Sequence, residues 1–306
     1  MNRKADSGVI NRLLLAIVVV GILAITTVMT GDITTRADAD DLINVSVKQL
    51  TTFADPNSRA SHPVYSPEGT KIVFNYAPTF LRFDIWVMNA DGSGQTRLTF
   101  NSDTNELPRW SPDGTKILFV RGPLYGNYEI WVMDADGSNQ VLLTNTPFQE
   151  WGPSWSPDGQ KIAFLSHESG DEDIWIMNAD GTNKKQITSN MDCRGTMVWS
   201  PDESRIAFTS NINGNYDIFV IDIDGSNLTQ LTTNSAMDGQ PEWSPDGRMI
   251  AYTSKSTGND DVWVMNSDGT NKTRLTTYDG IDAYAFWSPQ GNKLVFSSDR
   301  GGVQNI

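Results

Sequence analysis

The sequence predicts an all-β fold, a six-bladed β-propeller with four-stranded antiparallel blades, preceded by one N-terminal hydrophobic helix. The first observation is a repeat. The stretch WSPDGQKIAF at residues 155–164 has five further near copies, and the serines of their Ser-Pro pairs follow one another at steps of 45, 45, 44, 44 and 44 residues. These serines are Ser66, Ser111, Ser156, Ser200, Ser244 and Ser288. A fixed period of about 40 to 45 residues fits one four-stranded propeller blade.

The second observation is the turn chemistry inside each unit, as the copy from Pro153 to Thr188 shows. Residues 156–159 read Ser-Pro-Asp-Gly, which suits a tight turn because Pro fixes φ and Gly accepts a left-handed conformation. Apolar runs follow at 161–164 and 173–177, too short for helices. Asp180-Gly181 then marks a hairpin before the last strand at 185–188. Four strands joined by tight turns make one antiparallel sheet.

The third observation is the placement of tryptophan. Nine of the ten tryptophans occupy repeated positions, where large flat rings can fill the wedge between neighbouring blades. They are Trp86, Trp110, Trp131, Trp155, Trp175, Trp199, Trp243, Trp263 and Trp287, and we expect all of them in the core. Only Trp151 lies outside the pattern.

The fourth repeat departs from the others at its first turn. Asp202-Glu203-Ser204 stands where the other copies have an acidic or amide residue followed by glycine. Without glycine, the left-handed turn position is costly. The sequence therefore predicts a distorted or longer first hairpin in this repeat.

The N-terminal region contains a run that suggests contact with a membrane. Residues 13–30 (LLLAIVVVGILAITTVMT) carry no charge, and Arg3, Lys4 and Arg12 precede them. Eighteen residues is close to the lower limit for spanning a bilayer, whereas the apolar part of a cleaved signal is shorter. Residues 1–30 are therefore predicted to be a signal anchor or a signal peptide, with Ala37-Asp38-Ala39 as a possible cleavage site. In either case, the chain after Gly31 is expected to be exported.

The remaining chain divides into a short acidic tether at 31–44 and the propeller at 45–306. Residues 47–51 match the fourth strands of the other repeats, although no first three strands precede them. The last repeat stops at Asn305-Ile306, early in its third strand. We therefore expect the N-terminal strand to join the last blade and close the ring. Two alternatives stay open: the segment 42–51 fills the vacant third position, or the sequence is an incomplete copy of a longer chain.

Composition restricts the function classes. The net charge is −14, which argues against a nucleic-acid partner and permits basic proteins or cations. One cysteine, Cys193, excludes an internal disulfide. The two histidines, His62 and His167, do not have metal-ligand spacing and are expected to be ordinary loop residues. No metal or cofactor is predicted.

The repeated WSPDG-x-K-I-x-F, followed by D-I-W-V-M-N-A-D-G-S-N and L-T, resembles the propeller repeat of TolB and its relatives, a WD-repeat-like family. The resemblance covers about residues 45–306. It implies a propeller fold, and in relatives this fold occurs in scaffolds, ligand-binding proteins and the gating domain of prolyl oligopeptidase-like enzymes. TolB itself is a soluble periplasmic protein of the Tol-Pal system with an α/β domain ahead of its propeller. Because only 44 residues precede the propeller here, the resemblance extends to TolB-like propellers and not to that domain.

Two chemical signals are weak. The hydrolase motif Gly-x-Ser-x-Gly is absent from the sequence. The acidic turns 134–139 and 222–227 resemble the start of an EF-hand loop, but they lack its third ligand position before glycine and a closing Glu, so a hairpin turn explains them. A carboxylate also recurs at the first residue of each third strand, where we expect it to fix loop backbone: Asp84, Glu129, Asp173, Asp217 and Asp261.

Candidate site residues lie where the copies differ. In a propeller, the loops before the first strand and between the second and third strands emerge on one face, near the mouth of the central channel. The residues five before the tryptophan of successive repeats are Asn105, Glu150, Arg194, Asp238 and Asp282, and the large side chains Trp151 and Tyr284 lie near them. Such a rim is predicted to recognise a basic peptide, a sugar or a cation.

The sequence therefore indicates an exported, membrane-tethered propeller that acts as a non-catalytic scaffold in the cell envelope, binding an envelope protein, a peptide or a glycan. The alternative is the substrate-gating propeller of a prolyl oligopeptidase-like hydrolase. Sequence continuing beyond residue 306 with Gly-x-Ser-x-Gly would favour that alternative.

Overall fold

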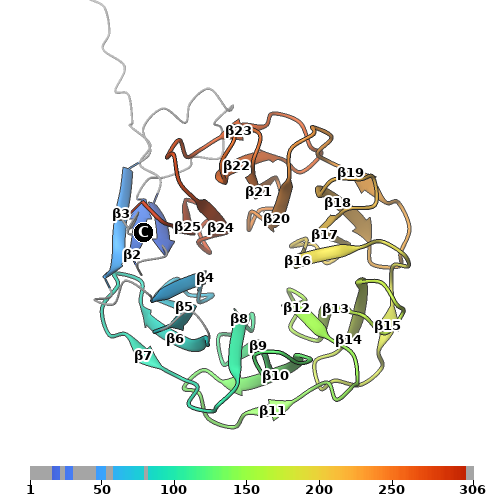
Figure 1. Ribbon diagram of the computed structural model, residues 1–306, viewed down its shortest axis with the longest axis horizontal. Coiled ribbons are helices and arrows are strands. Elements are labelled where there is room, and N and C mark those ends of the chain that lie inside the picture. Colours follow the sequence, from blue (N-terminus) through green and yellow to red (C-terminus); the bar gives the residue numbers. More distant parts are fainter. Residues whose placement is uncertain (1–15, 21–24, 30–45, 53–57, 79–81, 301–306) are drawn as a thin grey trace, which may run out of the picture.

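A computed structural model describes residues 16–20, 25–29, 46–52, 58–78 and 82–300. Its sheets are arranged radially in a ring around a central axis, with the first strand of each blade innermost (Figure 1). The described residues contain strands and turns and no helix. The prediction of an all-β propeller with four-stranded antiparallel blades is therefore confirmed for the regular blades.

Five blades are regular sheets of four strands in sequence order, each antiparallel to its neighbour. The first contains β4 (Arg59–Tyr65), β5 (Lys71–Ala77), β6 (Asp84–Asn89) and β7 (Thr96–Arg97). The second contains β8 (Thr104–Trp110), β9 (Lys116–Gly122), β10 (Glu129–Asp134) and β11 (Val141–Leu142). The third contains β12 (Glu150–Trp155), β13 (Lys161–Ser166), β14 (Asp173–Asn178) and β15 (Lys185–Gln186). The fourth contains β16 (Cys193–Trp199), β17 (Arg205–Ser210), β18 (Asp217–Asp222) and β19 (Thr229–Gln230). The fifth contains β20 (Asp238–Trp243), β21 (Met249–Ser254), β22 (Asp261–Asn266) and β23 (Thr273–Arg274).

The last sheet is different, and the prediction of six four-stranded antiparallel blades is wrong there. It has five strands in the order β2-β3-β1-β25-β24. Within the described residues, the sixth repeat supplies β24 (Asp282–Trp287) and β25 (Lys293–Ser298), and the N-terminal strands β1 (Ala16–Val20), β2 (Ile25–Met29) and β3 (Ser46–Thr52) complete the sheet. β1 runs parallel to both β25 and β3, so the sheet is mixed.

The predicted N-terminal helix is also not found. The apolar run contains β1 and β2, which pair with each other and with β3. Val, Ile and Thr dominate both strands, and their branched side chains favour extended backbone. Within the described ranges, no helix is long and apolar enough to cross a membrane. The other predicted parts of the N-terminal region, residues 1–15 and 30–45, lie outside the described residues.

The core lies between blades, as the repeated apolar positions predict. Between the first two blades, for example, Val73 and Ile85 pack with Trp110 and Phe119 in one buried cluster. An equivalent cluster joins the last sheet to the first blade, where Phe286 packs with Phe74. Because the ends of the chain thus meet across a buried interface, the ring is continuous.

Close backbone contacts also join successive blades. The third-to-fourth-strand turn of each regular blade contains a glycine that lies against a backbone carbonyl of the preceding blade's outer segment; a Cβ on Gly137 would be 2.8 Å from the carbonyl oxygen of Leu98. Gly92 of the first blade faces the carbonyl of Leu50 in β3 so closely that a Cβ would overlap it. β3 therefore meets the first blade as a fourth strand meets the next blade elsewhere.

The first hairpin of the fourth repeat is regular, so the predicted distortion is wrong. The amide of Glu203 donates to the Ser200 carbonyl oxygen at 2.9 Å, and that of Ser200 to the Arg205 carbonyl oxygen at 2.8 Å, as in the other copies. Glu203 adopts φ +62°, the conformation that glycine holds elsewhere at this place. The turn therefore forms at a conformational cost, because a residue with a Cβ is strained at this positive φ.

Candidate functional site

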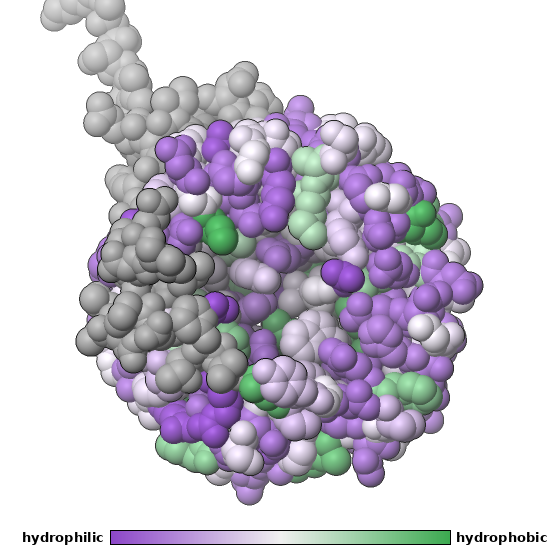
Figure 2. All heavy atoms as spheres, viewed as in Figure 1, coloured by the Kyte–Doolittle hydropathy of each residue, from purple (hydrophilic) through white to green (hydrophobic). Residues whose placement is uncertain are grey.

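The inner strands β4, β8, β12, β16, β20 and β24 surround the axis (Figure 1), and the molecule is hollowed at its centre on the face shown in Figure 2. Each inner strand contains a bulge relative to the second strand of its blade. At each bulge one residue has a left-handed backbone: His62, Leu107, Gly152, Gly195, Gln240 and Tyr284. Bulges re-aim side chains, and here they lie at positions where the copies differ in residue type.

An ion pair crosses the axis between blades on opposite sides of the ring. Nη1 of Arg109 in β8 lies 3.4 Å from Oε2 of Glu242 in β20, and the two residues are 133 positions apart in the sequence. Arg109 is buried and also stacks on the ring of Phe286, with Cζ 4.3 Å from the centroid. The Glu242 side chain keeps 17% exposure. Burial outweighs the nearby guanidinium and raises the pKa of Glu242 to about 7.

His62 lies beside this ion pair. Its ring centroid is 4.0 Å from that of Tyr284. Burial, followed by the charge of Arg109, lowers the pKa of His62 to about 3, so the ring is neutral at physiological pH. Its Nδ1 lies 3.3 Å from Asn75 Nδ2. Because an amide nitrogen can only donate, Nδ1 accepts, and the proton of the neutral ring is on Nε2.

Gln240 extends the cluster across the fifth and sixth repeats. Its Oε1 accepts hydrogen bonds from the Thr253 hydroxyl at 2.7 Å and from the Tyr284 amide at 3.3 Å. Together with His62, Arg109 and Glu242, these contacts connect four blades around the axis. We call His62, Arg109, Gln240, Glu242 and Tyr284 the axial cluster. It brings cationic, anionic, neutral hydrogen-bonding and aromatic groups together at the axis.

Four of the predicted rim residues are buried and bonded within the loops. Asn105 accepts a hydrogen bond from Arg121 Nε at 2.8 Å, and Asp238 accepts one from Asn234 at 2.6 Å. Glu150 accepts one from the Thr146 hydroxyl at 2.8 Å, and Arg300 pairs with Asp282. Burial raises the pKa of Glu150 to about 7 and raises the pKa values of Asp238 and Asp282. Because these four side chains are buried, they do not present a surface for direct contact at the mouth.

Arg194 does not align with these four in space. In the other blades the backbone N–H of this position donates to a carbonyl of the preceding blade, as Glu150 does to Tyr128 and Asp238 to Tyr216. In the fourth repeat the amide that does so belongs to Cys193, which is buried. The bulge of β16 contains more residues than the bulges of the other inner strands. A constant step of 44 residues from Glu150 therefore ends at Arg194, one position beyond the equivalent residue, Cys193. Arg194 is exposed, with its guanidinium carbon 4.9 Å from the ring centroid of Tyr216.

The two predicted aromatic residues are half-buried on the inner strands. Trp151 packs edge to face against Tyr128 with a centroid distance of 4.9 Å. Tyr284 belongs to the axial cluster. Of the predicted site residues, Trp151, Arg194 and Tyr284 therefore present surface to solvent, whereas Asn105, Glu150, Asp238 and Asp282 support the loops.

Sequence reasoning missed four members of the axial cluster. His62 was expected in a loop, but it lies within β4; His167 is in a loop, as expected. The signal lies two residues after the predicted rim positions, because four residues before the Ser-Pro serine the copies read His, Leu, Gly, Gln and Tyr in all repeats but the fourth. Arg109 and Glu242 could not be paired from sequence, since only closure of the ring brings them together.

The recurring third-strand carboxylates fix the ends of the outer strands. The Thr232 hydroxyl donates to Asp217 at 2.9 Å and accepts from the Ile218 amide at 2.9 Å. Thr188 does the same for Asp173 and the Ile174 amide, at 3.0 and 2.8 Å. These carboxylates are structural parts of the blade, which agrees with their expected role.

A comparison with family models matches residues 120–260 to the TolB beta propeller domain. The predicted resemblance to TolB-like propellers is thereby confirmed. No curated protein sequence matches the chain.

Similar solved structures agree on the fold. TolB from Acinetobacter baumannii superposes with a TM-score of 0.72 at 23% identity over 90% of this chain and 66% of that one. A protein from Agrobacterium tumefaciens described as a TolB gives 0.68 at 21% identity, over 83% and 94%. A puromycin-hydrolyzing peptidase from Mycobacterium tuberculosis gives 0.60 at 16% identity, over 86% of this chain and 45% of that one. At these identities the likeness concerns the fold.

Proposed function

We propose that this chain is an exported, membrane-tethered, TolB-like propeller that binds a protein or peptide partner in the cell envelope at the mouth of its channel and performs no chemistry itself. One observation carries the proposal. The sequences of the turns and of the core positions are nearly the same in every repeat. The inner strands, in contrast, differ in sequence and bring the axial cluster together at the centre of the ring. Residues that depart from an otherwise copied scaffold are the ones free to specify a ligand.

The protonation state of His62 supports a binding role. The Ser61 hydroxyl lies 3.1 Å from His62 Nδ1, an arrangement that could suggest an activated nucleophile. With a pKa of about 3, however, the imidazole is too weak a base to take that proton at neutral pH. Asn75, rather than a carboxylate, bonds its Nδ1. Ser61 therefore lacks, in His62, the general base that a nucleophilic serine needs.

Export and tethering rest on the N-terminal sequence, with its charged start and its apolar run at 13–30. Because part of this run forms β1 and β2 in the last sheet, tethering requires these two strands to leave that sheet for the membrane. A fusion of alkaline phosphatase to the full chain tests this proposal, since that reporter is active only outside the cytoplasm. Activity in the membrane fraction is expected. Activity confined to the soluble periplasmic fraction would support a cleaved signal, and an inactive reporter would contradict export.

The binding role is tested by capture of partners from the native envelope with the full chain, followed by measurement of the affinity of each purified partner. Tyr284→Ala and Trp151→Ala alter the channel mouth without removing a buried charge. Thr229→Ala, on the outer strand β19, is the matched control. We expect the first two variants to weaken binding at least tenfold and the control to leave it unchanged. Equal binding by all variants would contradict the proposal.

The substrate-gating role is a second candidate, because the propeller of a peptidase shares the fold. A coding sequence that continues past residue 306 into a Gly-x-Ser-x-Gly segment would favour it.

A further inference from the structure

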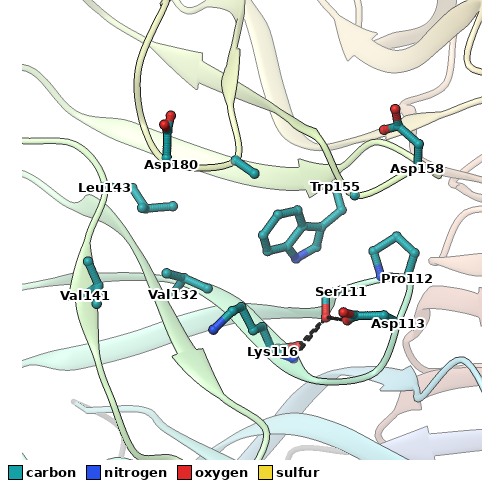
Figure 3. Close-up of a pocket in the computed structure, with 12 residues that line it drawn as sticks. Ser111, Pro112, Asp113, Lys116, Val132, Val141, Leu143, Trp155, Asp158 and Asp180 are labelled. Atoms are coloured by element: carbon teal, nitrogen blue, oxygen red, sulfur yellow. Dashed lines mark hydrogen bonds between the residues drawn. The ribbon is translucent and has the colours of Figure 1, made fainter.

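The groove between the second and third blades differs from the other grooves around the ring. It has a volume of about 740 Å³ and lies between the first hairpins and outer strands of the two blades. Trp155 points into it, with Leu143, Val132 and Val141 extending toward one end and Pro112 near the other (Figure 3).

Trp155 is the least buried of the aromatic residues that end the inner strands. It is half-buried, whereas the other five members of this set are buried. Those are Tyr65, Trp110, Trp199, Trp243 and Trp287. One ring that the repeat normally covers is thus left open to solvent.

In one other groove a basic side chain lies over the corresponding ring. In the groove between the fourth and fifth blades, the guanidinium carbon of Arg205 lies 5.1 Å from the ring centroid of Trp243. Lys116 begins β9 as Arg205 begins β17, but its ammonium donates to Asp134 at 2.9 Å. The cation that covers Trp243 therefore has no counterpart over Trp155.

The outer wall of this groove is apolar, in contrast to the other blades. β11 reads Val-Leu, and Val141 and Leu142 are 52% and 38% exposed. The corresponding two-residue strands of the other four regular blades read Thr-Arg, Lys-Gln, Thr-Gln and Thr-Arg. An exposed apolar pair at one copy of a polar position indicates a contact surface.

The rim of the groove is acidic. Asp113, Asp158 and Asp180 line it and are exposed. Hydrogen bonds from Ser111, Ser156 and Thr182 respectively are the main reason why their pKa values lie below the usual range. They stay ionised at neutral pH, and the one lysine that lines the groove is already paired. Such turns occur at other grooves too, so the rim supplies the charge and Trp155 with Val141 supplies the selectivity.

We propose that this groove binds a short basic peptide segment of a partner protein, in which an arginine places its guanidinium on Trp155, near the acidic rim, and a neighbouring apolar residue covers Val141. The contact of Arg205 with Trp243 shows, within the same molecule, that this position accepts a guanidinium. Stacking on an indole and proximity to carboxylates both favour arginine. The site is separate from the channel mouth and does not depend on a ligand there.

The test uses the full chain and two blocked pentapeptides, Val-Arg-Val-Arg-Val and Val-Glu-Val-Glu-Val, titrated by NMR. The indole N–H signal of Trp155 is the one lost in Trp155→Phe. We expect this signal to shift with the arginine peptide, with a Kd on the order of 0.1 to 1 mM at low salt that weakens as salt rises. The glutamate peptide should leave the signal unchanged.

Two variants then locate the contact. Lys116→Arg should supply the missing guanidinium from the chain itself and weaken peptide binding about tenfold, because the Trp155 face is then occupied. Val141→Thr, the residue type of other blades, should weaken it several-fold. Thr229→Ala, on the outer strand β19 of another blade, is the control and should bind the peptide as the native chain does. Equal affinity for both peptides, or unchanged binding by both Lys116→Arg and Val141→Thr, would overturn the proposal.

Discussion

At the scale of single residues, Glu203 shows how strictly the repeat imposes its turn. It holds φ +62°, where Gly69, Gly114, Gly159 and Gly247 hold +70° to +73°. A side chain in this conformation costs about 1 kcal/mol relative to glycine. The hairpin forms in spite of this cost because its hydrogen bonds and the flanking strands specify it.

Replacing Glu203 with glycine should therefore stabilise the protein by about 1 kcal/mol. The reverse change at the matched position, Gly247→Glu, should destabilise it by a similar amount, since a Cβ there meets only ordinary contacts with Pro201. Urea unfolding of both variants measures the two effects. If Glu203→Gly lowered the stability, the strain at this turn would be refuted.

Glu242 makes stability depend on pH. Its pKa is about 7 in the folded protein, above the value of the unfolded chain, so the folded state binds more protons between about pH 4.5 and 7. Its stabilising contribution is present below this range and is lost as the pH rises through it. The loss is at most about 3 kcal/mol.

Glu242→Gln should remove part of this dependence, because glutamine does not titrate. Unfolding free energies measured from about pH 4.5 to 8 should fall less steeply for the variant than for the native chain. Burial also raises the pKa values of Glu150 and Glu172, each to about 7, so some slope will remain. Identical slopes would contradict the assignment to Glu242.

At the scale of elements, each regular blade is fixed at its outer end by a threonine. Thr232 bonds Asp217 and the Ile218 amide at the same time and is fully buried. Without its hydroxyl, a carboxylate and a backbone amide would each lose a partner inside the protein. Buried groups left unpaired in this way cost about 1 to 3 kcal/mol.

Thr232→Val should thus destabilise the protein by about 2 kcal/mol. Thr229→Val, on the neighbouring strand β19, keeps the same change of shape at an exposed position and should lie within about 0.5 kcal/mol of the native chain. Thermal unfolding of the two variants separates the effects. Equal destabilisation would show that the hydroxyl of Thr232 is not what holds the strand.

The hairpins could be predicted from the sequence because their signals are local. Ser-Pro-Asp-Gly and Asp-Gly are residue types that specify tight turns by themselves, and strand-forming residues flank them on both sides. The bulges of the inner strands could not, since His62, Leu107 and Tyr284 are left-handed without a glycine to mark them. The longer bulge of β16 also has no local signal in the sequence, so Arg194 was predicted at the position that Cys193 occupies.

At the scale of the whole molecule, the ring is continuous only if the last sheet meets the first blade. The backbone of β3 lies directly against Gly92, and Leu50 packs on the cluster that joins Phe286 to Phe74. The match of residues 47–51 to fourth strands predicted that this segment joins the last blade, and β3 lies in that sheet. The order of strands in the last sheet could not be foretold, because the apolar run that forms β1 and β2 reads equally as a membrane segment.

Gly92→Ala should weaken this junction. The new methyl group would overlap the Leu50 carbonyl, which costs about 1 to 3 kcal/mol beyond the strain of a positive φ. Gly214→Ala is the matched control, since its φ is +98° against +93° for Gly92 and no atom lies within 4 Å of its Cβ position. Chemical unfolding should show a larger loss for Gly92→Ala. Equal losses would mean that β3 does not pack there.

Opposite blades meet at the axis through Arg109 and Glu242, and a double-mutant cycle on this pair measures the contact. Unfolding free energies are measured at about pH 8, where Glu242 is ionised, for Arg109→Met, Glu242→Gln and the double variant. Residues in contact couple, so we expect the two single losses to exceed the loss in the double variant by about 1 kcal/mol or more. Losses that add to within about 0.5 kcal/mol would show that β8 and β20 do not meet across the channel.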